Sequence, residues 1–131
     1  MKNTIFKLTE YVYYFSLLVL LILYLFPGSL IGYFLYGNLG QQPNFIANPI
    51  GTSINHLIFF SYITVLAIIV RLKVKNIFTN YLVILFISCV LEILHLIVPN
   101  RAFELYDLIA NIAGVVIILL INSFIKWQKY L

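Results

Sequence analysis

The residues able to do chemistry are concentrated in residues 92–114 (EILHLIVPNRAFELYDLIANIAG) of a chain that has only four acidic residues and two histidines. Carboxylates, imidazoles, a guanidinium and an amide can ligate metals, transfer protons or bind polar ligands. Another imidazole lies earlier in the chain, at the start of an apolar run. The candidates for ligand binding or a polar network are His56, Glu92, His95, Arg101, Asp107 and Asn111.

Metal binding and catalysis have little support from the motifs. Glu92 and His95 have the Glu-x-x-His spacing of carboxylate-bridged metal bundles, but those bundles need this motif from two helices plus two further carboxylates. The chain has one copy, and it has no His-Glu-x-x-His, Gly-x-Ser-x-Gly or phosphate-loop motif. Lone histidines are usually packed and hydrogen-bonded. The sequence therefore predicts no metal site and no cofactor, favours a protein that is not an enzyme, and assigns no catalytic residue.

The composition indicates a protein dissolved in lipid. Of the 131 residues, 63% are hydrophobic and 9% are charged, whereas soluble domains have roughly 45–50% apolar and about 25% charged residues. The single cysteine, Cys89, lies inside an apolar run, so no internal disulfide can form.

Four apolar stretches define the elements that must position the polar residues. A spanning helix needs roughly 17–25 residues, and the runs are too long and too uniformly apolar for strands. The sequence therefore predicts an all-α membrane protein with one domain over residues 1–131. Its four transmembrane helices form a compact bundle, with spans at approximately 8–27, 54–71, 77–98 and 105–126.

The distribution of basic residues predicts the orientation in the membrane. Four spans place both termini and the second loop on one side, which then holds seven of the eight basic residues; only Arg101 lies on the other. The positive-inside rule puts that basic side in the cytoplasm. The net charge of +4 is then explained by topology, and we expect no nucleic-acid partner. Residues 92–114 therefore face the non-cytoplasmic side.

Spacing predicts that the polar residues share helix faces and one depth. Glu92 and His95 are related as i and i+3, and Asp107, Asn111 and Gly114 as i, i+4 and i+7. His56 lies near the same end of the second span. Gly114 is predicted to let a neighbouring helix approach closely.

Two interpretations of this polar layer remain open. In the first, the groups only hold the bundle together: Asp107 pairs with Arg101 or His56, and Asn111 with Glu92 or His95. In the second, they line an outer-leaflet pocket for a polar headgroup, and apolar helices receive the acyl chains. A carboxylate costs about 2.5–3.5 kcal/mol at the bilayer centre, so it is rarely incidental within a span.

The outer loop, residues 28–53, is long and contains no charged residue. Its first part, GSLIGYFLYG, is apolar and aromatic, and its second part is rich in amides, glycine and proline. Residues 28–37 either extend the first helix, lie in the membrane interface, or dock on a partner. The last possibility supports an alternative function, that of a small accessory subunit packed through this loop against a larger membrane protein complex.

The run PNRAFELYDLIANIAG, preceded by a glutamate within a span, resembles the signature of VanZ-like membrane proteins. In that family a glutamate in the third span is followed by a proline-containing turn, an arginine, and an aspartate, asparagine and glycine that open the fourth span. The second span here, with a histidine followed by aromatic residues and a tyrosine, is also similar. Two positions depart from the pattern: Thr52-Ser53 replaces an Asp-Lys pair, and His95 replaces a glutamine. The matching residues are His56, Phe60, Tyr62, Glu92, Pro99, Arg101, Asp107, Asn111 and Gly114.

This resemblance implies a bacterial inner-membrane protein that works at the cell envelope. The family is named for low-level resistance to a lipidated glycopeptide antibiotic, and its name does not establish catalysis. We therefore expect the partners to be membrane lipids and a lipid or lipid-linked envelope molecule bound in the polar pocket. The loss of the Asp-Lys pair makes the ligand itself an open question.

Overall fold

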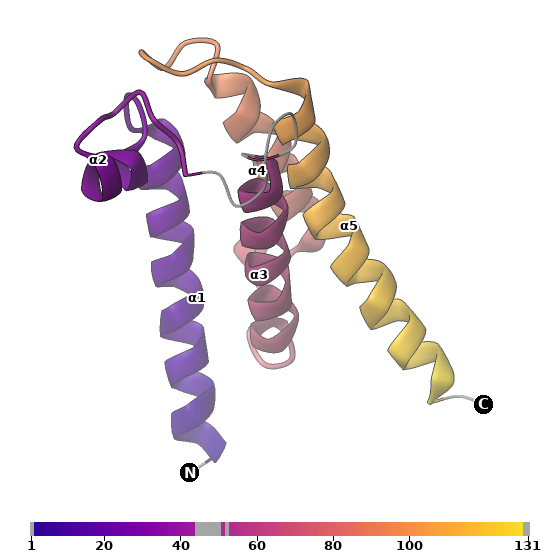
Figure 1. The fold of residues 1–131 in the computed structure, drawn as a ribbon. Helices are drawn as coiled ribbons and strands as arrows, with labels where there is room; N and C mark the ends of the chain where they lie inside the picture. The colour runs from indigo at the N-terminus through magenta and orange to yellow at the C-terminus, as the bar shows by residue number, and fades with distance from the viewer. Residues whose placement is uncertain (1, 44–50, 52, 130–131) are drawn as a thin grey trace.

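The computed structural model describes residues 2–43, 51 and 53–129, and within them all regular structure is helical (Figure 1). Among the residues that the structure describes, three helices, α1, α3 and α5, are long and apolar enough to cross a membrane. This confirms the prediction of an all-helical chain, and the three long apolar helices are compatible with a membrane protein. The elements are α1 (Lys2–Leu25), α2 (Leu30–Tyr36), α3 (Ser53–Arg71), the 3-10 helix η1 (Ile77–Thr79), α4 (Tyr81–Leu94) and α5 (Leu105–Gln128).

The predicted third span, 77–98, forms two helical pieces and a run of turns. Asn76 caps η1 through a reciprocal capping box with Thr79, and the Asn80 side chain accepts a hydrogen bond from the backbone N–H of Leu82 to begin α4. Asparagine favours such caps because its side chain bonds nearby backbone N–H groups. The 14 residues of α4 extend about 21 Å, less than the roughly 30 Å hydrocarbon core.

The first helix ends at Leu25, and α2 is a separate short helix rather than an extension of α1. Pro27 has no backbone N–H, and Gly28 has a φ of 90°, which a helix cannot accommodate. Ser29 then caps α2 by accepting a hydrogen bond from Gly32. In Figure 1, α2 lies across the upper end of α1.

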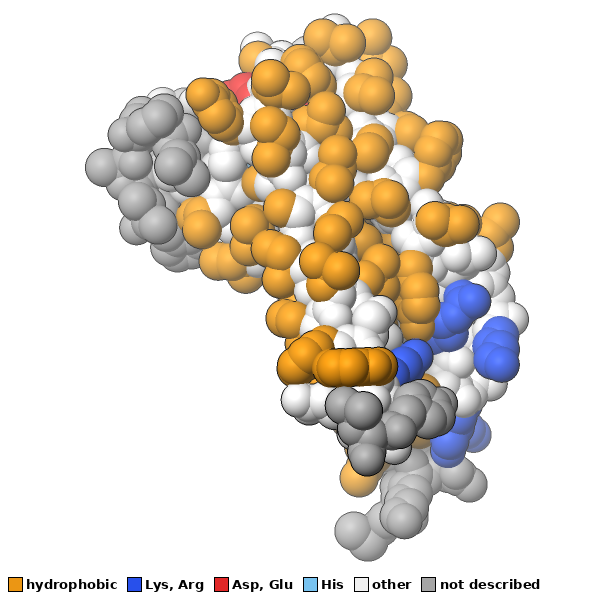
Figure 2. Space-filling model, turned by 90° about the vertical axis from the view of Figure 1, so that its right-hand side faces the viewer, with side chains coloured by type: hydrophobic (Ala, Val, Ile, Leu, Met, Phe, Trp, Pro, Cys, Tyr) orange, Lys and Arg blue, Asp and Glu red, His pale blue; other side chains and the backbone are white. Residues whose placement is uncertain are grey.

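The two ends of the molecule differ in what they carry. The start of α1, the end of α5 and the α3–α4 connection lie at the lower end in Figure 1, whereas α2 and the α4–α5 connection lie at the upper end. On the face shown in Figure 2, apolar side chains dominate the upper and middle parts, and Lys and Arg side chains gather toward the lower end.

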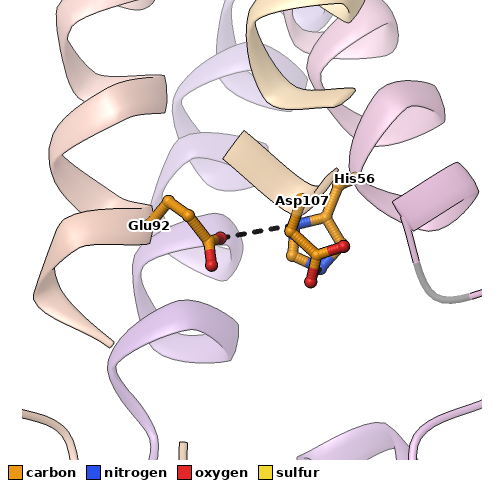
Figure 3. A group of neighbouring side chains, drawn as sticks. All are labelled: His56, Glu92 and Asp107. Carbon is orange, nitrogen blue, oxygen red and sulfur yellow. Dashed lines mark ion pairs between the residues drawn. The ribbon is translucent and has the colours of Figure 1, made fainter. Parts of the chain in front are cut away.

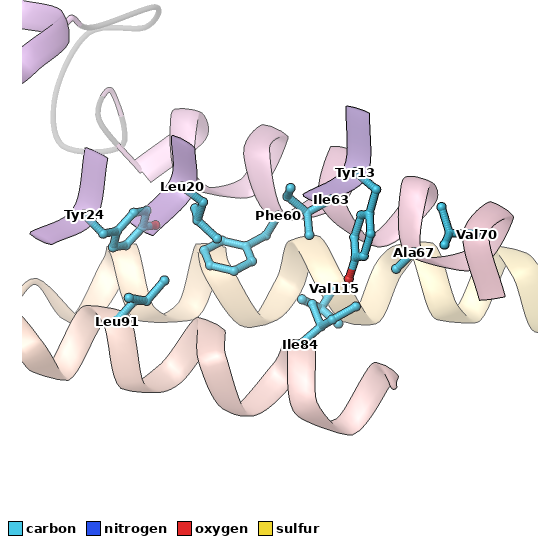
Figure 4. Close-up of a cluster of buried hydrophobic side chains, with 10 residues drawn as sticks. All are labelled: Tyr13, Leu20, Tyr24, Phe60, Ile63, Ala67, Val70, Ile84, Leu91 and Val115. Carbon is cyan, nitrogen blue, oxygen red and sulfur yellow. The ribbon is translucent and has the colours of Figure 1, made fainter. Parts of the chain in front are cut away.

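The core lies around α3, which packs against α1 on one side and α5 on the other. At Gly114 of α5 the helices lie close together, because a Cβ built on this residue would lie 2.6 Å from the carbonyl oxygen of Leu57 in α3. The Ser61 hydroxyl donates to the Gly114 carbonyl at 3.2 Å, so the two helices touch at the glycine for which the sequence predicts close packing. The buried cluster in Figure 4 comprises Tyr13, Leu20, Tyr24, Phe60, Ile63, Ala67, Val70, Ile84, Leu91 and Val115.

Candidate functional site

Three helices bring an imidazole and two carboxylates together at the upper end of the bundle. His56 comes from the first turns of α3, Glu92 from the last turn of α4, and Asp107 from the first turn of α5. Figure 3 shows their side chains pointing toward one another. One potential ligand atom from each residue lies within 4.8 Å of the other two. Both carboxylates are buried, with exposed fractions of 0% for Glu92 and 3% for Asp107.

Asp107 is held by α3. Its Oδ2 lies 3.4 Å from His56 Nε2, and its Oδ1 accepts a hydrogen bond from the Ser53 hydroxyl at 2.5 Å. Ser53 and His56 are three residues apart, so both face α5. Of the two partners that the sequence left open for Asp107, the structure shows His56.

Asn111 lies at the centre of a second set of hydrogen bonds. Its amide nitrogen donates to the carbonyl of Ser88 in α4 at 3.1 Å, which turns Oδ1 toward α1 and α3. That oxygen accepts from the Tyr24 hydroxyl at 2.8 Å and lies 3.2 Å from His56 Nδ1. The sequence predicted Glu92 or His95 as partners of Asn111. The contacts are different because the packing of the helices brings Tyr24 of α1 and the Ser88 backbone of α4 within hydrogen-bond distance of the amide.

Glu92 is only half satisfied by its neighbours. Its Oε1 accepts from the backbone N–H of Glu104 at 3.2 Å and lies 3.2 Å from His95 Nδ1. Its Oε2 has no hydrogen-bond partner among the described residues, and the closest ion-pair contact is His56 Nδ1 at 3.8 Å. A buried acceptor without a partner is costly, so this oxygen needs an explanation.

His95, at the C-terminal end of α4, forms one side of the site. Its ring stacks on Tyr24, with 5.3 Å between ring centroids and an interplanar angle of 18°. Only 4% of the residue is exposed, and Nε2 has no hydrogen-bond partner within the described part of the chain.

Arg101 binds the end of α1 rather than a carboxylate. Its Nη2 donates to the Leu23 carbonyl at 2.7 Å, and its Nε contacts the Phe26 carbonyl at 3.4 Å. These carbonyls lack intrahelical partners at a helix C-terminus, where a positive charge is also favourable. Burial lowers the pKa of Arg101, and Tyr24, Glu92 and Asp107 partly offset this effect. A guanidinium nevertheless stays protonated.

A partly open cavity of about 90 Å³ lies beside these groups, and a wider groove of about 420 Å³ adjoins it. Both are lined by Ile31, Pro43, Asn55 and Phe59. The cavity alone is also lined by Leu20, Leu23, Tyr24, Ser29, Leu30, Gln42, His56, His95 and Arg101. The groove alone is also lined by Leu35, Tyr36 and Ile58.

The structure therefore gathers five of the six predicted polar residues into direct contacts, and places Arg101 at the wall of the same cavity as His56 and His95. Tyr24 and Ser53 were missed. The spacing of Ser53 from His56 was an available signal, whereas nothing distinguished Tyr24 from the other tyrosines. Thr52, the other residue of the Thr52-Ser53 pair that departs from the VanZ-like pattern, lies outside the described residues.

Comparison of the chain with protein-family models, curated proteins and solved structures finds no match.

Proposed function

We propose that this chain is a multi-pass membrane protein that binds the polar headgroup of a lipid or of a lipid-linked cell-envelope molecule. The observation that carries the proposal is the continuity between two spaces of opposite character. A small cavity with histidine, tyrosine and arginine side chains adjoins a larger groove lined mainly by apolar and aromatic side chains. An amphiphile has the same division between a polar head and an apolar chain.

The sizes of the two spaces support this assignment. About 90 Å³ holds a small polar group but not a whole lipid, whereas about 420 Å³ is in the range of small-molecule pockets, roughly 300–1,000 Å³. The headgroup would occupy the cavity, and part of an acyl chain would follow the groove between α2 and α3.

Arg101 favours a phosphate-bearing headgroup, and His95 adds a polar atom to the same cavity. A guanidinium has five N–H donors, and Arg101 uses two of its nitrogens on the carbonyls of Leu23 in α1 and of Phe26 just after it. The remaining N–H groups are available to a phosphate oxygen in the cavity that Arg101 lines. His95 lines the same cavity, and its Nε2, which has no hydrogen-bond partner among the described residues, is available to a polar group of the ligand.

In this proposal the chain crosses the membrane four times, with both termini in the cytoplasm and the cavity on the outer side of a bacterial inner membrane. The third crossing is α4 with its flanking turns, residues 77–98. The position of both chain ends and the Lys and Arg side chains at the lower end of the molecule supports it (Figures 1 and 2). The cavity then lies near the opposite membrane surface, where headgroups are found.

The resemblance to VanZ-like proteins supports the same proposal and stays part of it. The residues of that pattern with ionisable or amide side chains contribute to one cluster, even though they come from different helices and a connecting loop. Cell-envelope work by the family is consistent with a lipid-linked ligand. The residues concerned are His56, Glu92, Arg101, Asp107 and Asn111.

A second candidate function is that of a small accessory subunit of a larger membrane complex. The surface of α2 favours it, because Phe34 is 81% exposed and Leu35 is 60% exposed. A partner that covers α2 would remove these side chains from solvent. A headgroup-level position of α2 would accommodate the same surface without a partner.

Native mass spectrometry of the protein extracted in mild detergent tests the first function against the second. Retention of a phosphate-containing lipid supports headgroup binding, and a co-purifying polypeptide without such a lipid supports the accessory subunit. Leu23 lines the cavity, whereas Leu18 is 54% exposed on the same helix. Leu23→Trp should therefore displace the lipid and Leu18→Trp should not. Equal retention by both variants would contradict binding in this cavity.

A further inference from the structure

His56 and Asp107 place two possible ligand atoms at the separation expected for two ligands of one metal ion. In a tetrahedral zinc site, metal–ligand bonds of about 2.0–2.1 Å place two ligand atoms about 3.4 Å apart. The structure has 3.4 Å between His56 Nε2 and Asp107 Oδ2. With Glu92 as the third residue, one possible ligand atom from each residue lies within 4.8 Å of the other two, so closure around an ion needs a shift on the order of 1 Å.

The unpartnered oxygen of Glu92 is an independent indication of a missing cation. Glu92 is fully buried, and Oε2 has no hydrogen-bond partner among the described residues although Oε1 is well satisfied. Oε2 lies on the side of His56, 3.8 Å from the ring nitrogen Nδ1. Buried carboxylates are normally paired with a cation or hydrogen-bonded on both oxygens.

The neighbouring hydrogen bonds leave one ligand atom free on each residue. His56 Nδ1 lies 2.7 Å from the Tyr24 hydroxyl, which itself donates to Asn111, so Nδ1–H is the donor, and in the neutral ring Nε2 keeps its lone pair. The Ser53 hydroxyl holds Oδ1 of Asp107 and leaves Oδ2. Metal-binding histidines commonly donate their other ring N–H in this way, which fixes the ring and the tautomer.

We propose that His56, Glu92 and Asp107 form a binding site for a divalent first-row transition-metal ion such as Zn²⁺. One imidazole with two carboxylates suits such an ion better than Mg²⁺ or Ca²⁺, which prefer all-oxygen ligands. The two carboxylates and a neutral imidazole carry a charge of −2, which a divalent ion neutralises inside the protein. Three protein ligands also leave a coordination position open for water or for a ligand oxygen.

This inference departs from the prediction of no metal site made from sequence motifs. The ligands come from three helices and share no local spacing, so no motif could have revealed them. It also stands apart from the proposed function, because it rests on ligand geometry and not on the cavity. Metal binding and lipid retention are measured separately, so a negative result for one proposal does not decide the other.

Titration with Zn²⁺ after removal of any affinity tag and treatment with EDTA tests the site. Isothermal calorimetry on the detergent-solubilised protein should show about one ion per chain, and Co²⁺ should give visible absorption bands of a low-coordinate site. Glu92→Gln and Asp107→Asn should each weaken Zn²⁺ binding by about tenfold or more. Glu10→Gln, in the first half of α1, is the control and should bind as the wild type does.

A second readout does not depend on the variants folding. Zn²⁺ should raise the thermal unfolding midpoint of the wild-type protein, since an ion that binds only the folded state stabilises it, and the same concentration of Mg²⁺ should not. Folded wild-type protein without saturable Zn²⁺ binding or a shift in midpoint would overturn the proposal. Unchanged affinity in well-folded Glu92→Gln and Asp107→Asn proteins would overturn it as well.

Discussion

His56 of α3 and Asp107 of α5 meet across the most extensively packed helix pair among the described residues, with Nε2 3.4 Å from Oδ2. The contact lies two turns above Gly114, where the backbones of the same helices touch. The polar cluster thus depends on the close packing of α3 and α5. Its stability can be tested by substitutions in the cluster itself and by a substitution at Gly114.

Replacement of Asp107 with alanine should destabilise the protein. Ser53 and His56 would lose their partner in a buried site, which costs about 1–3 kcal/mol. Thermal unfolding in detergent, followed by circular dichroism, should show a lower midpoint than the wild type. Asp107→Asn keeps an acceptor for Ser53 and should fall between the two. An unchanged midpoint for Asp107→Ala would mean that the contact does not form in the folded protein.

Two substitutions of Glu92 distinguish the contribution of its hydrogen bonds to stability from the contribution of its size. Glu92→Gln retains an oxygen for the backbone N–H of Glu104, whereas Glu92→Leu leaves that N–H and His95 Nδ1 without their acceptor. We expect Gln to be tolerated and Leu to lower the free energy of unfolding by about 1–3 kcal/mol. Denaturant unfolding of both variants provides the comparison. If Leu were as stable as Gln, these hydrogen bonds would contribute nothing to stability.

A methyl group at Gly114 should force α3 and α5 apart. The new Cβ would lie 2.6 Å from the Leu57 carbonyl oxygen and 3.1 Å from the Ser61 nitrogen, both of which belong to backbone. We expect Gly114→Ala to cost about 1–3 kcal/mol, as overpacking does. Gly40→Ala, where only the Asn38 side chain lies within 4 Å, is the matched control and should change stability by less than about 0.5 kcal/mol.

Sidedness can be measured by cysteine labelling in intact cells. Asn38, which follows α2, and Lys75, in the α3–α4 connection, are both exposed. In a Cys89→Ser background, an impermeant maleimide should label Asn38→Cys and should label Lys75→Cys only after the cells are opened. The opposite pattern would place the cavity on the cytoplasmic side.

The long apolar helices could be predicted because a long apolar run has few alternatives to a helix in lipid. The predicted starts of the second and fourth spans, residues 54 and 105, lie within one residue of the starts of α3 and α5. The third predicted span was less accurate, since the caps formed by Asn76 and Asn80 depend on local side-chain bonds that an average over apolar residues does not detect.

The site could be predicted only where its residues share a helix. The i, i+3 and i, i+4 spacings placed Glu92 with His95 and Asp107 with Asn111. Contacts between helices, such as Tyr24 with Asn111 and Arg101 with Leu23, depend on how the helices pack. One sequence contains no periodic signal for such packing, so Arg101 was paired with Asp107 as one alternative when its bonds are to α1.

Photo-cross-linking tests headgroup binding most directly. The wild-type protein and Leu23→Trp are reconstituted with a phospholipid that carries a diazirine beside its phosphate, and the modified peptides are mapped by mass spectrometry. Headgroup binding predicts modification of wild-type cavity residues, including Tyr24, His56 and Phe59, and its loss in Leu23→Trp. Modification confined to outward-facing residues such as Leu18 and Leu120, or identical in the two proteins, would contradict it.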